Sequence, residues 1–148
     1  MKKSTSDEKF KLGRQYLNGE GVKQDDKQAV HWWRLAAEEG NADAQCSLGM
    51  AYWEGQGVKQ DDEQAVHWLR LAVEQGYPAA ENSLGVAYLK GEGVEQDDEQ
   101  AVHWLRLAAE QGNADAQHNL GASYQLGRGV EKDYKQAVHW LAPKQPIV

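Results

Sequence analysis

Residues 61–76 read DDEQAVHWLRLAVEQG, and residues 97–112 read DDEQAVHWLRLAAEQG. The two stretches begin 36 residues apart (97 − 61 = 36) and differ at a single position, where Val73 in the first corresponds to Ala109 in the second. Identity this high does not arise from chance composition. A fixed period of this size is typical of repeat proteins, in which each unit buries its apolar face against its neighbours.

The same period extends over the chain in both directions. A His-Trp dipeptide, a glycine, a tyrosine and a Gly-x-Gly-Val segment each recur four times. We therefore predict one repeat domain over residues 1–148, with repeats at about residues 5–40, 41–76, 77–112 and 113–142 and a tail at 143–148. The recurring positions are His31-Trp32, His67-Trp68, His103-Trp104 and His139-Trp140; Gly13, Gly49, Gly85 and Gly121; Tyr16, Tyr52, Tyr88 and Tyr124; and the segments that end at Val22, Val58, Val94 and Val130.

Each repeat is predicted to contain two helices. In the second repeat, Ala44, Leu48 and Ala51 recur at steps of four and three residues, which places them on one helical face. Gly55 ends this helix, because glycine adopts the left-handed cap conformation without a Cβ penalty. We expect eight helices in four antiparallel pairs and no strands, which is an all-α solenoid.

An aspartate opens the second helix of each repeat. Asp61 can accept the free backbone N–H groups of the first turn, and the side chain of Gln64 can reach back to the N–H of Asp61 in a capping box. The apolar stripe of this helix then begins at Ala65. The same pair recurs as Asp25/Gln28, Asp97/Gln100 and Asp133/Gln136.

The charge balance restricts the partners of the chain. Its 16 Lys and Arg against 23 Asp and Glu give a formal net charge of −7. Duplex nucleic acid and anionic membranes need clustered cations, so neither is expected as a partner. No apolar run approaches the roughly 20 residues that are needed to span a bilayer. The chain has a single cysteine, Cys46, which excludes an internal disulfide. We expect a cytoplasmic protein, or a periplasmic or secreted one if a leader has been removed.

Residues 29–61, AVHWWRLAAEEGNADAQCSLGMAYWEGQGVKQD, resemble the Sel-one-like repeat (SLR) family, a relative of the tetratricopeptide repeat. The resemblance covers roughly residues 5–142 and rests on Leu-Gly-x-x-Tyr and Gly-x-Gly-Val recurring in phase. It implies a right-handed α-solenoid that acts as an adaptor and holds other proteins in a concave groove. An exported, cysteine-rich branch has been credited with weak β-lactamase-type activity, but this chain lacks the cysteines of that branch.

The recurring positions are best explained by folding. We expect the tryptophans at 32, 68, 104 and 140 to anchor the stack, and Gly49 to permit close approach of helices. The histidines directly before them turn about 100° away from the buried face. Successive repeats lie too far apart for two of these rings to share a zinc ion, which needs nitrogens at about 2.0–2.1 Å. No metal and no cofactor are predicted.

Function is expected where the repeats differ. The differences lie on the first helix of each repeat, where Cys46, Met50 and Trp53 follow one another at steps of four and three and form a single stripe. Apolar side chains mixed with Arg, Lys and Asn suit a peptide or helix bound in a groove. The predicted protein-binding residues are Phe10, Lys11, Arg14, Leu17, Cys46, Ser47, Met50, Trp53, Glu54, Asn82, Val86, Leu89, Lys90, His118, Asn119 and Gln125.

The predicted function is a non-catalytic protein–protein interaction adaptor. One alternative is an immunity-type inhibitor that blocks a single toxin or enzyme, and a remote one is a β-lactamase-like hydrolase. No nucleophile elbow, phosphate-binding loop or zinc-protease motif is present in the sequence to support catalysis.

Pro143 ends the last helix early. At that end of the solenoid we expect either that residues 144–148 cover the apolar surface or that two chains stack there as a weak homodimer.

Overall fold

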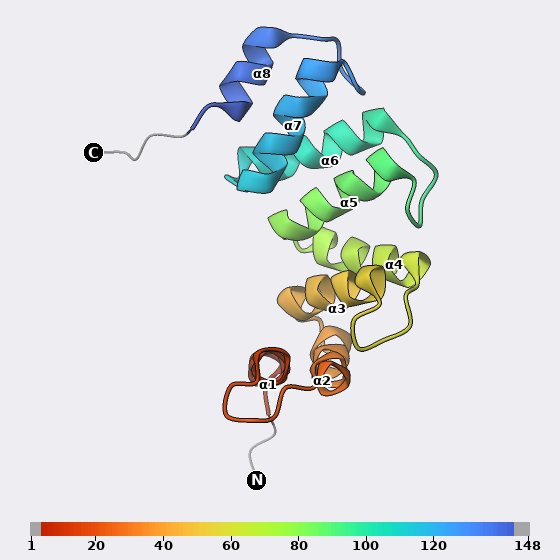
Figure 1. Ribbon diagram of the computed structural model, residues 1–148, viewed down its shortest axis with the longest axis vertical. Helices are drawn as coiled ribbons and strands as arrows, with labels where there is room; N and C mark the ends of the chain where they lie inside the picture. Colours follow the sequence, from red (N-terminus) through yellow and green to blue (C-terminus); the bar gives the residue numbers. More distant parts are fainter. Residues whose placement is uncertain (1–3, 144–148) are drawn as a thin grey trace, which may run out of the picture.

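A computed structural model describes residues 4–143 and contains eight α-helices and no strand over that range (Figure 1). The helices form four antiparallel pairs, as the sequence predicts. Their bounds are α1 (Ser6–Asn18), α2 (Asp26–Glu38), α3 (Ala42–Glu54), α4 (Asp62–Glu74), α5 (Pro78–Lys90), α6 (Asp98–Glu110), α7 (Ala114–Leu126) and α8 (Tyr134–Leu141).

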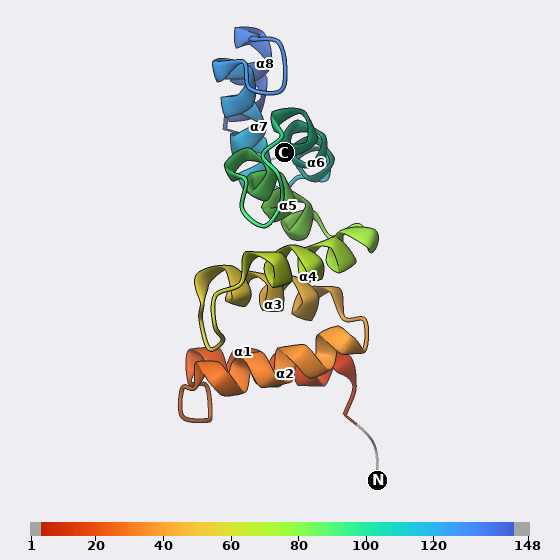
Figure 2. The ribbon, with the colours of Figure 1, turned by 90° about the vertical axis from the view of Figure 1, so that its right-hand side faces the viewer.

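The helix pairs stack along one axis into an elongated solenoid. Each helix packs on the one before it and the one after it in the chain. The first pair, α1 and α2, lies at one end of the molecule and the last pair, α7 and α8, at the other (Figures 1 and 2). The all-α solenoid predicted from the 36-residue period is confirmed. In the described residues, no helix is both long and apolar enough to span a bilayer.

Aspartate caps the second helix of every repeat, as predicted. The carboxylate of Asp61 accepts from the backbone N–H of Gln64, and Asp25, Asp97 and Asp133 make the same contact in their repeats. The predicted return contact from the glutamine side chain is wrong. The N–H of Asp61 instead donates to the carbonyl oxygen of Tyr52 at 2.9 Å, and the other three repeats do the same. This bond closes the Gly-x-Gly-Val loop by tying the start of the second helix to the end of the first.

Leucine, and not tryptophan, fills the centre of the core. The largest completely buried side chains are Leu48, Leu69, Leu84, Leu105 and Leu120. Of the tryptophans predicted as anchors, Trp68 is buried, whereas those at 32, 104 and 140 are half-buried. The reason is helical geometry: Trp68 precedes Leu69 by one residue and lies about 100° to the side of the stripe that faces the partner helix.

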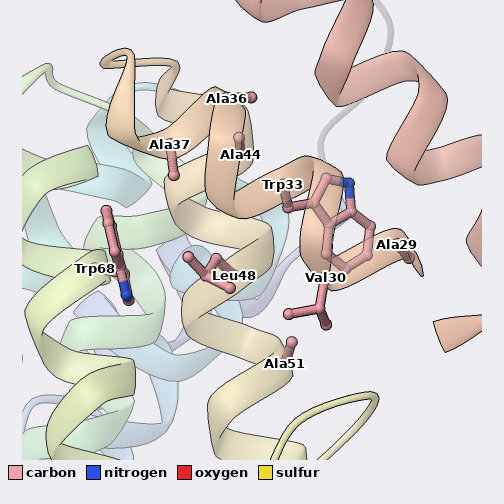
Figure 3. Packing of buried hydrophobic residues seen from close by; sticks show 9 residues of the cluster. All are labelled: Ala29, Val30, Trp33, Ala36, Ala37, Ala44, Leu48, Ala51 and Trp68. Carbon is pink, nitrogen blue, oxygen red and sulfur yellow. The ribbon is translucent and has the colours of Figure 1, made fainter. Parts of the chain in front are cut away.

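The tryptophans pack instead near the junctions between repeats. Trp68 on α4 belongs to the cluster that joins the first two repeats, which includes Val30 and Trp33 of α2 and Leu48 of α3. Figure 3 shows Leu48 with Trp68 on one side and Trp33 and Val30 on the other. Trp33 occupies the position that Leu69 and Leu105 take in the next two repeats. The first repeat therefore fills its centre with an indole.

A glycine on each first helix lets the paired helix approach, as predicted. A Cβ added at Gly49 would lie 3.0 Å from both the carbonyl oxygen of Ala65 and the Cγ of Leu69 on α4. In the first repeat, a Cβ added at Gly13 would lie 2.5 Å from the indole of Trp33. The glycine thus makes room for the large residue at the centre of each hairpin.

An arginine–tyrosine contact links each repeat to the next. The Nη2 atom of Arg34 donates to the hydroxyl oxygen of Tyr52 at 2.7 Å, and Arg70 donates to Tyr88 at 2.9 Å. Each guanidinium also lies 5.5–5.9 Å from the centre of the tyrosine ring. Arg106 makes the same contacts with Tyr124. The tyrosine therefore joins two repeats through its side chain and closes its own loop through its carbonyl.

The last helix is shorter than the others, as the proline at 143 predicts. Helix α8 has 8 residues where each of the other seven has 13, and it ends at Leu141. The expectation that residues 144–148 cover this end, with Ile147 and Val148 on the apolar surface, lies outside the described residues.

Candidate functional site

The first helices of successive repeats contact one another through side chains. The hydroxyl of Ser83 on α5 donates to the Sδ atom of Met50 on α3 at 3.5 Å. The side-chain amide of Asn119 on α7 donates to that of Asn82 on α5 at 3.0 Å. These four residues occupy variable positions of the repeat. The variable side chains therefore share one surface that runs along the stack.

Near the N-termini of these helices, polar bonds cross the first two junctions. The amide of Asn41, the N-cap of α3, donates to the carboxylate of Asp7 on α1 at 2.8 Å. At the next junction, the hydroxyl of Tyr77, which precedes α5, donates to the carboxylate of Asp43 on α3 at 2.5 Å. Burial, followed by this bond and the charge of Asp43, raises the pKa of Tyr77 well above its ordinary value. These bonds link α1 to α3 and α3 to the residue before α5.

A cavity of about 290 Å³ opens between α1 and α3. Seven of the predicted binding residues line it, three from α1 and four from α3. The rest of its lining was not predicted from the sequence. The predicted lining residues are Phe10, Arg14, Leu17, Cys46, Ser47, Met50 and Glu54, and the others are Trp33, Ala51, Gln56 and Tyr77.

The chemistry of this cavity suits an apolar side chain with polar neighbours. Phe10, Leu17 and Met50 supply apolar walls, and the exposed Arg14 and Glu54 supply one charge of each sign. The guanidinium of Arg14 lies 5.9 Å from the centre of the Phe10 ring, so the cation rests beside an aromatic wall. Concave apolar sites with a few polar groups are the usual form of a ligand site.

The remaining predicted residues lie outside this cavity. Lys11 lines a separate depression of about 210 Å³ beside Arg14, and Gln125 lines another next to α8. Val86 and Leu89 on α5 are half-buried, whereas Lys90 and His118 are exposed. Asn82 and Asn119 are bonded to each other, as described above. The structure thus gathers seven of the nine candidates of the first two repeats into one cavity and leaves those of the last two along the surface.

Trp53 differs from its neighbours in the predicted stripe. It is half-buried and packs against buried residues of the second and third repeats, among them Leu69 and Leu84. It does not line the cavity. Trp53 therefore contributes more to the junction between repeats than to an open binding surface.

Two of the missed lining residues depart from the repeat pattern. Trp33 stands where other repeats carry leucine, and Tyr77 stands where Asn41 and Asn113 cap the corresponding helices. The predicted binding residues all lie on the first helices of the repeats, whereas Trp33 belongs to α2 and Tyr77 precedes α5. Comparing all 36 positions of the repeat would have identified both.

Cys46 packs as a small apolar group, as its lone occurrence suggests. Burial, and secondarily the negative charge of Asp43, raises the pKa of its thiol to about 12. At pH 8 about one thiol in ten thousand is then ionised, and the thiolate is the reactive form. We predict that an alkylating or disulfide reagent modifies Cys46 at least about a hundredfold more slowly in the folded chain than in urea. A folded-state rate at pH 8 within about tenfold of the unfolded rate would contradict this burial.

The recurring histidines lie on the surface, as predicted. His31, His67 and His103 are exposed, and each ring stands edge-on against the tryptophan that follows it, with ring centres 4.8–5.3 Å apart. His139 makes the same contact with Trp140. Over residues 4–143, no group of three or more His, Cys, Asp or Glu is arranged to hold a metal ion.

The model of one family matches the chain four times. Its description is "Sel1 repeat", and the matches cover residues 9–41, 42–77, 78–113 and 114–142. A search of curated proteins returns no match to the chain.

Solved structures of two proteins with this repeat superpose closely. One is c5321, a protective antigen of uropathogenic Escherichia coli strains that displays an SLR fold, with 44% identity over 91% of this chain and a TM-score of 0.87. The other is a Sel1 repeat protein from Oxalobacter formigenes, with 38% identity over 92% of this chain and the same TM-score. This chain spans 29% of the first structure and 56% of the second.

A third structure comes from a cysteine-rich protein. Helicobacter pylori cysteine rich protein B is 28% identical over 82% of this chain and 87% of its own, with a TM-score of 0.60. The present chain has one cysteine, so its hairpins are held together without internal disulfides.

Proposed function

The chain belongs to the Sel1 repeat family, and on that premise we propose that it is a non-catalytic scaffold that holds a peptide or protein segment along the first helices of its repeats. Sel1 repeat proteins generally act as scaffolds for protein–protein interaction. The cavity between α1 and α3 supports this proposal most directly. It combines apolar walls with one charge of each sign, from Arg14 and Glu54, on the variable surface of the repeats.

The bound segment is proposed to insert one large apolar side chain between Phe10 and Met50. A cavity of about 290 Å³ is of the size that takes a leucine, methionine or phenylalanine side chain. An acidic residue of the segment would lie near Arg14 and a basic one near Glu54, because opposite charges attract across a partly desolvated rim. The variable residues of α5 and α7, such as Asn82 and Asn119, would then contact the remainder of the segment.

The geometry gives less support to a hydrolase. The one thiol of the chain, Cys46, lies in the wall of the cavity, and its pKa of about 12 leaves it protonated at neutral pH. A thiol nucleophile is reactive as the thiolate and is activated by a lowered pKa. Cys46 is therefore proposed to shape the cavity and not to attack a substrate.

The test is peptide selection followed by a charge substitution in the cavity. Peptides selected from a random display library against the wild-type chain are measured by isothermal titration. We predict that Met50→Asp weakens their binding at least about tenfold, or ~1.4 kcal/mol, because it places a carboxylate against the apolar side chain. Leu107→Asp serves as the control, since Leu107 is an exposed apolar residue of α6 away from the cavity.

The outcomes separate the proposed functions. Binding that survives Met50→Asp, or that falls equally with Leu107→Asp, contradicts the assignment of the cavity. Selection of several related peptides with modest affinity favours a scaffold. An immunity-type inhibitor would instead select no short peptide and would bind one folded target very tightly.

A further inference from the structure

The end of the solenoid formed by α8 exposes a face that every other repeat buries. Val30, Val66 and Val102 occupy equivalent positions on the second helices of the first three repeats and are 5%, 5% and 6% exposed. Val138 is the equivalent residue of α8 and is 66% exposed. In the earlier repeats the first helix of the following repeat covers this position, as α5 covers Val66 with Leu84 and Ala87. Nothing in the described part of the chain covers Val138 in this way.

The exposed face is largely apolar, and the ammonium of Lys132 lies 5.3 Å from the centre of the Tyr134 ring at its edge. It contains a depression of about 310 Å³ whose lining residues carry no ionisable carboxylate, ammonium or guanidinium group. Apolar surface of this kind is costly to leave in water and marks an interaction site. The lining residues are Gln125, Tyr134, Ala137, Val138, Leu141 and Ala142.

Two residues at this face differ from their equivalents in the earlier repeats. The residue equivalent to Arg34, Arg70 and Arg106, which bond to the tyrosine of the next repeat, is Ala142. The residue equivalent to Asp26, Asp62 and Asp98 is Tyr134, which is 63% exposed. A polar residue has thus been replaced by an aromatic one where the surface is open. The face retains its apolar centre but lacks the arginine that bonds to the tyrosine of the next repeat and the carboxylate that Asp98 offers to Arg128.

The opposite end of the solenoid does not complement this face. Where α3, α5 and α7 carry buried alanines at 44, 80 and 116 to pack on the preceding repeat, α1 carries Glu8. Where α3 and α5 carry Ala51 and Ala87, α1 carries Gln15. Docking α1 of a second copy on α8 in the register of α5 on α4 would place the side-chain amide of Gln15, and not an alanine, against Val138, which is unfavourable without a hydrogen-bond partner. Head-to-tail stacking of copies is therefore disfavoured.

We propose that this face pairs with the same face of a second copy of the chain, around a two-fold axis that passes close to α8. An isologous contact is self-complementary, so the apolar residues of one copy cover those of the other and the assembly closes at two. The chain has a net charge of −7, and two such chains repel each other. The residues that line the depression carry no carboxylate, so pairing at this face brings no two negative charges together at its centre.

The test is sedimentation of the full chain from about 5 µM to 1 mM. We expect a monomer–dimer equilibrium without larger species, and an association constant that falls at least about tenfold in Val138→Glu, since two carboxylates then meet at the centre of the contact. Leu107→Glu is the matched control, because it makes the same kind of change at another exposed apolar residue and should leave the equilibrium unchanged. Circular dichroism of both variants establishes that they are folded.

A mixing experiment tests the two-fold arrangement itself. Val138→Glu and Val138→Lys should each associate weakly alone and should associate together at least as strongly as the wild type, because opposite charges meet when position 138 faces its own copy. A chain that stays monomeric to 1 mM overturns the proposal. So does open-ended assembly, a failure of the mixture to associate, or a dimer that forms only after residues 144–148 are deleted.

Discussion

Gly57→Ala is expected to lower the free energy of unfolding by about 3 kcal/mol. Gly57 has φ +74°, in the left-handed region that costs a residue with a Cβ roughly 1–2 kcal/mol. A Cβ at this position would also lie 2.6 Å from the carbonyl carbon of Asp26 in the preceding repeat and closer still to its oxygen. Both neighbours are backbone atoms, so the junction between the two repeats has to open, which adds about 1–3 kcal/mol.

Gly21→Ala separates the two causes. Gly21 occupies the same place in the first repeat and has the same φ of +74°, but a Cβ there would meet no atom within 4 Å. This variant should lose only the conformational part, about 1 kcal/mol. Urea unfolding of both variants measures the difference. Equal losses would mean that the loop of the second repeat does not dock on Asp26, and the stacking of repeats described above would be wrong.

Leu84→Ala is expected to cost about 3–4 kcal/mol. Leu84 on α5 is completely buried in the third repeat and belongs to the cluster that joins it to the second through Val66. Truncation leaves a cavity that the closely packed helices cannot fill, and buried leucines lose about 2–5 kcal/mol when changed to alanine. For a domain of about 150 residues, this corresponds to a fall in Tm of roughly 6–16 °C.

Leu107→Ala is the control for this prediction. Leu107 on α6 is 38% exposed, so its truncation should change the stability by less than about 1 kcal/mol. Thermal unfolding followed by circular dichroism measures both. A loss at Leu84 no larger than the loss at Leu107 would show that the leucine positions are not the centre of the core.

The repeat period made most of the fold predictable from the sequence. Local signals at fixed positions, such as Asp61 before a helix and Gly55 after one, specify where helices begin and end, and four copies of each signal reinforce one another. Contacts between elements were harder to predict. The N–H of Asp61 bonds to the carbonyl oxygen of Tyr52, and no property of those two side chains indicates a bond between their backbones.

The residue at the centre of each hairpin was not predictable from the sequence, for a similar reason. Trp68 and Leu69 are adjacent and both apolar, so the sequence pattern alone does not say which of them faces the paired helix. In the structure, Gly49 leaves room on α3 for the branched end of Leu69, and the indole of Trp68 lies to the side, near the junction between repeats. The glycine on the paired helix therefore determines that the leucine, and not the tryptophan, faces that helix.

The sequence predicted most of the residues that line the cavity proposed as the binding site, but not the shape of that cavity. Differences between repeats identified Phe10, Arg14 and Met50, which the structure places around one cavity. The same comparison also selected Trp53, which packs into the junction of the second and third repeats. The residues of one helical stripe do not all point in the same direction. The packing of the neighbouring repeat determines which of them it covers and which remain exposed.

The central claim is that a partner segment binds in the cavity between α1 and α3, and NMR mapping tests it most directly. An amide-labelled chain is titrated with a peptide from the selection described above. We predict that the largest changes in amide chemical shift occur at residues of α1 and α3 around Phe10, Ser47 and Met50. Changes centred on the surface that carries His31, His67 and His103, with residues near Met50 unaffected, would contradict the claim.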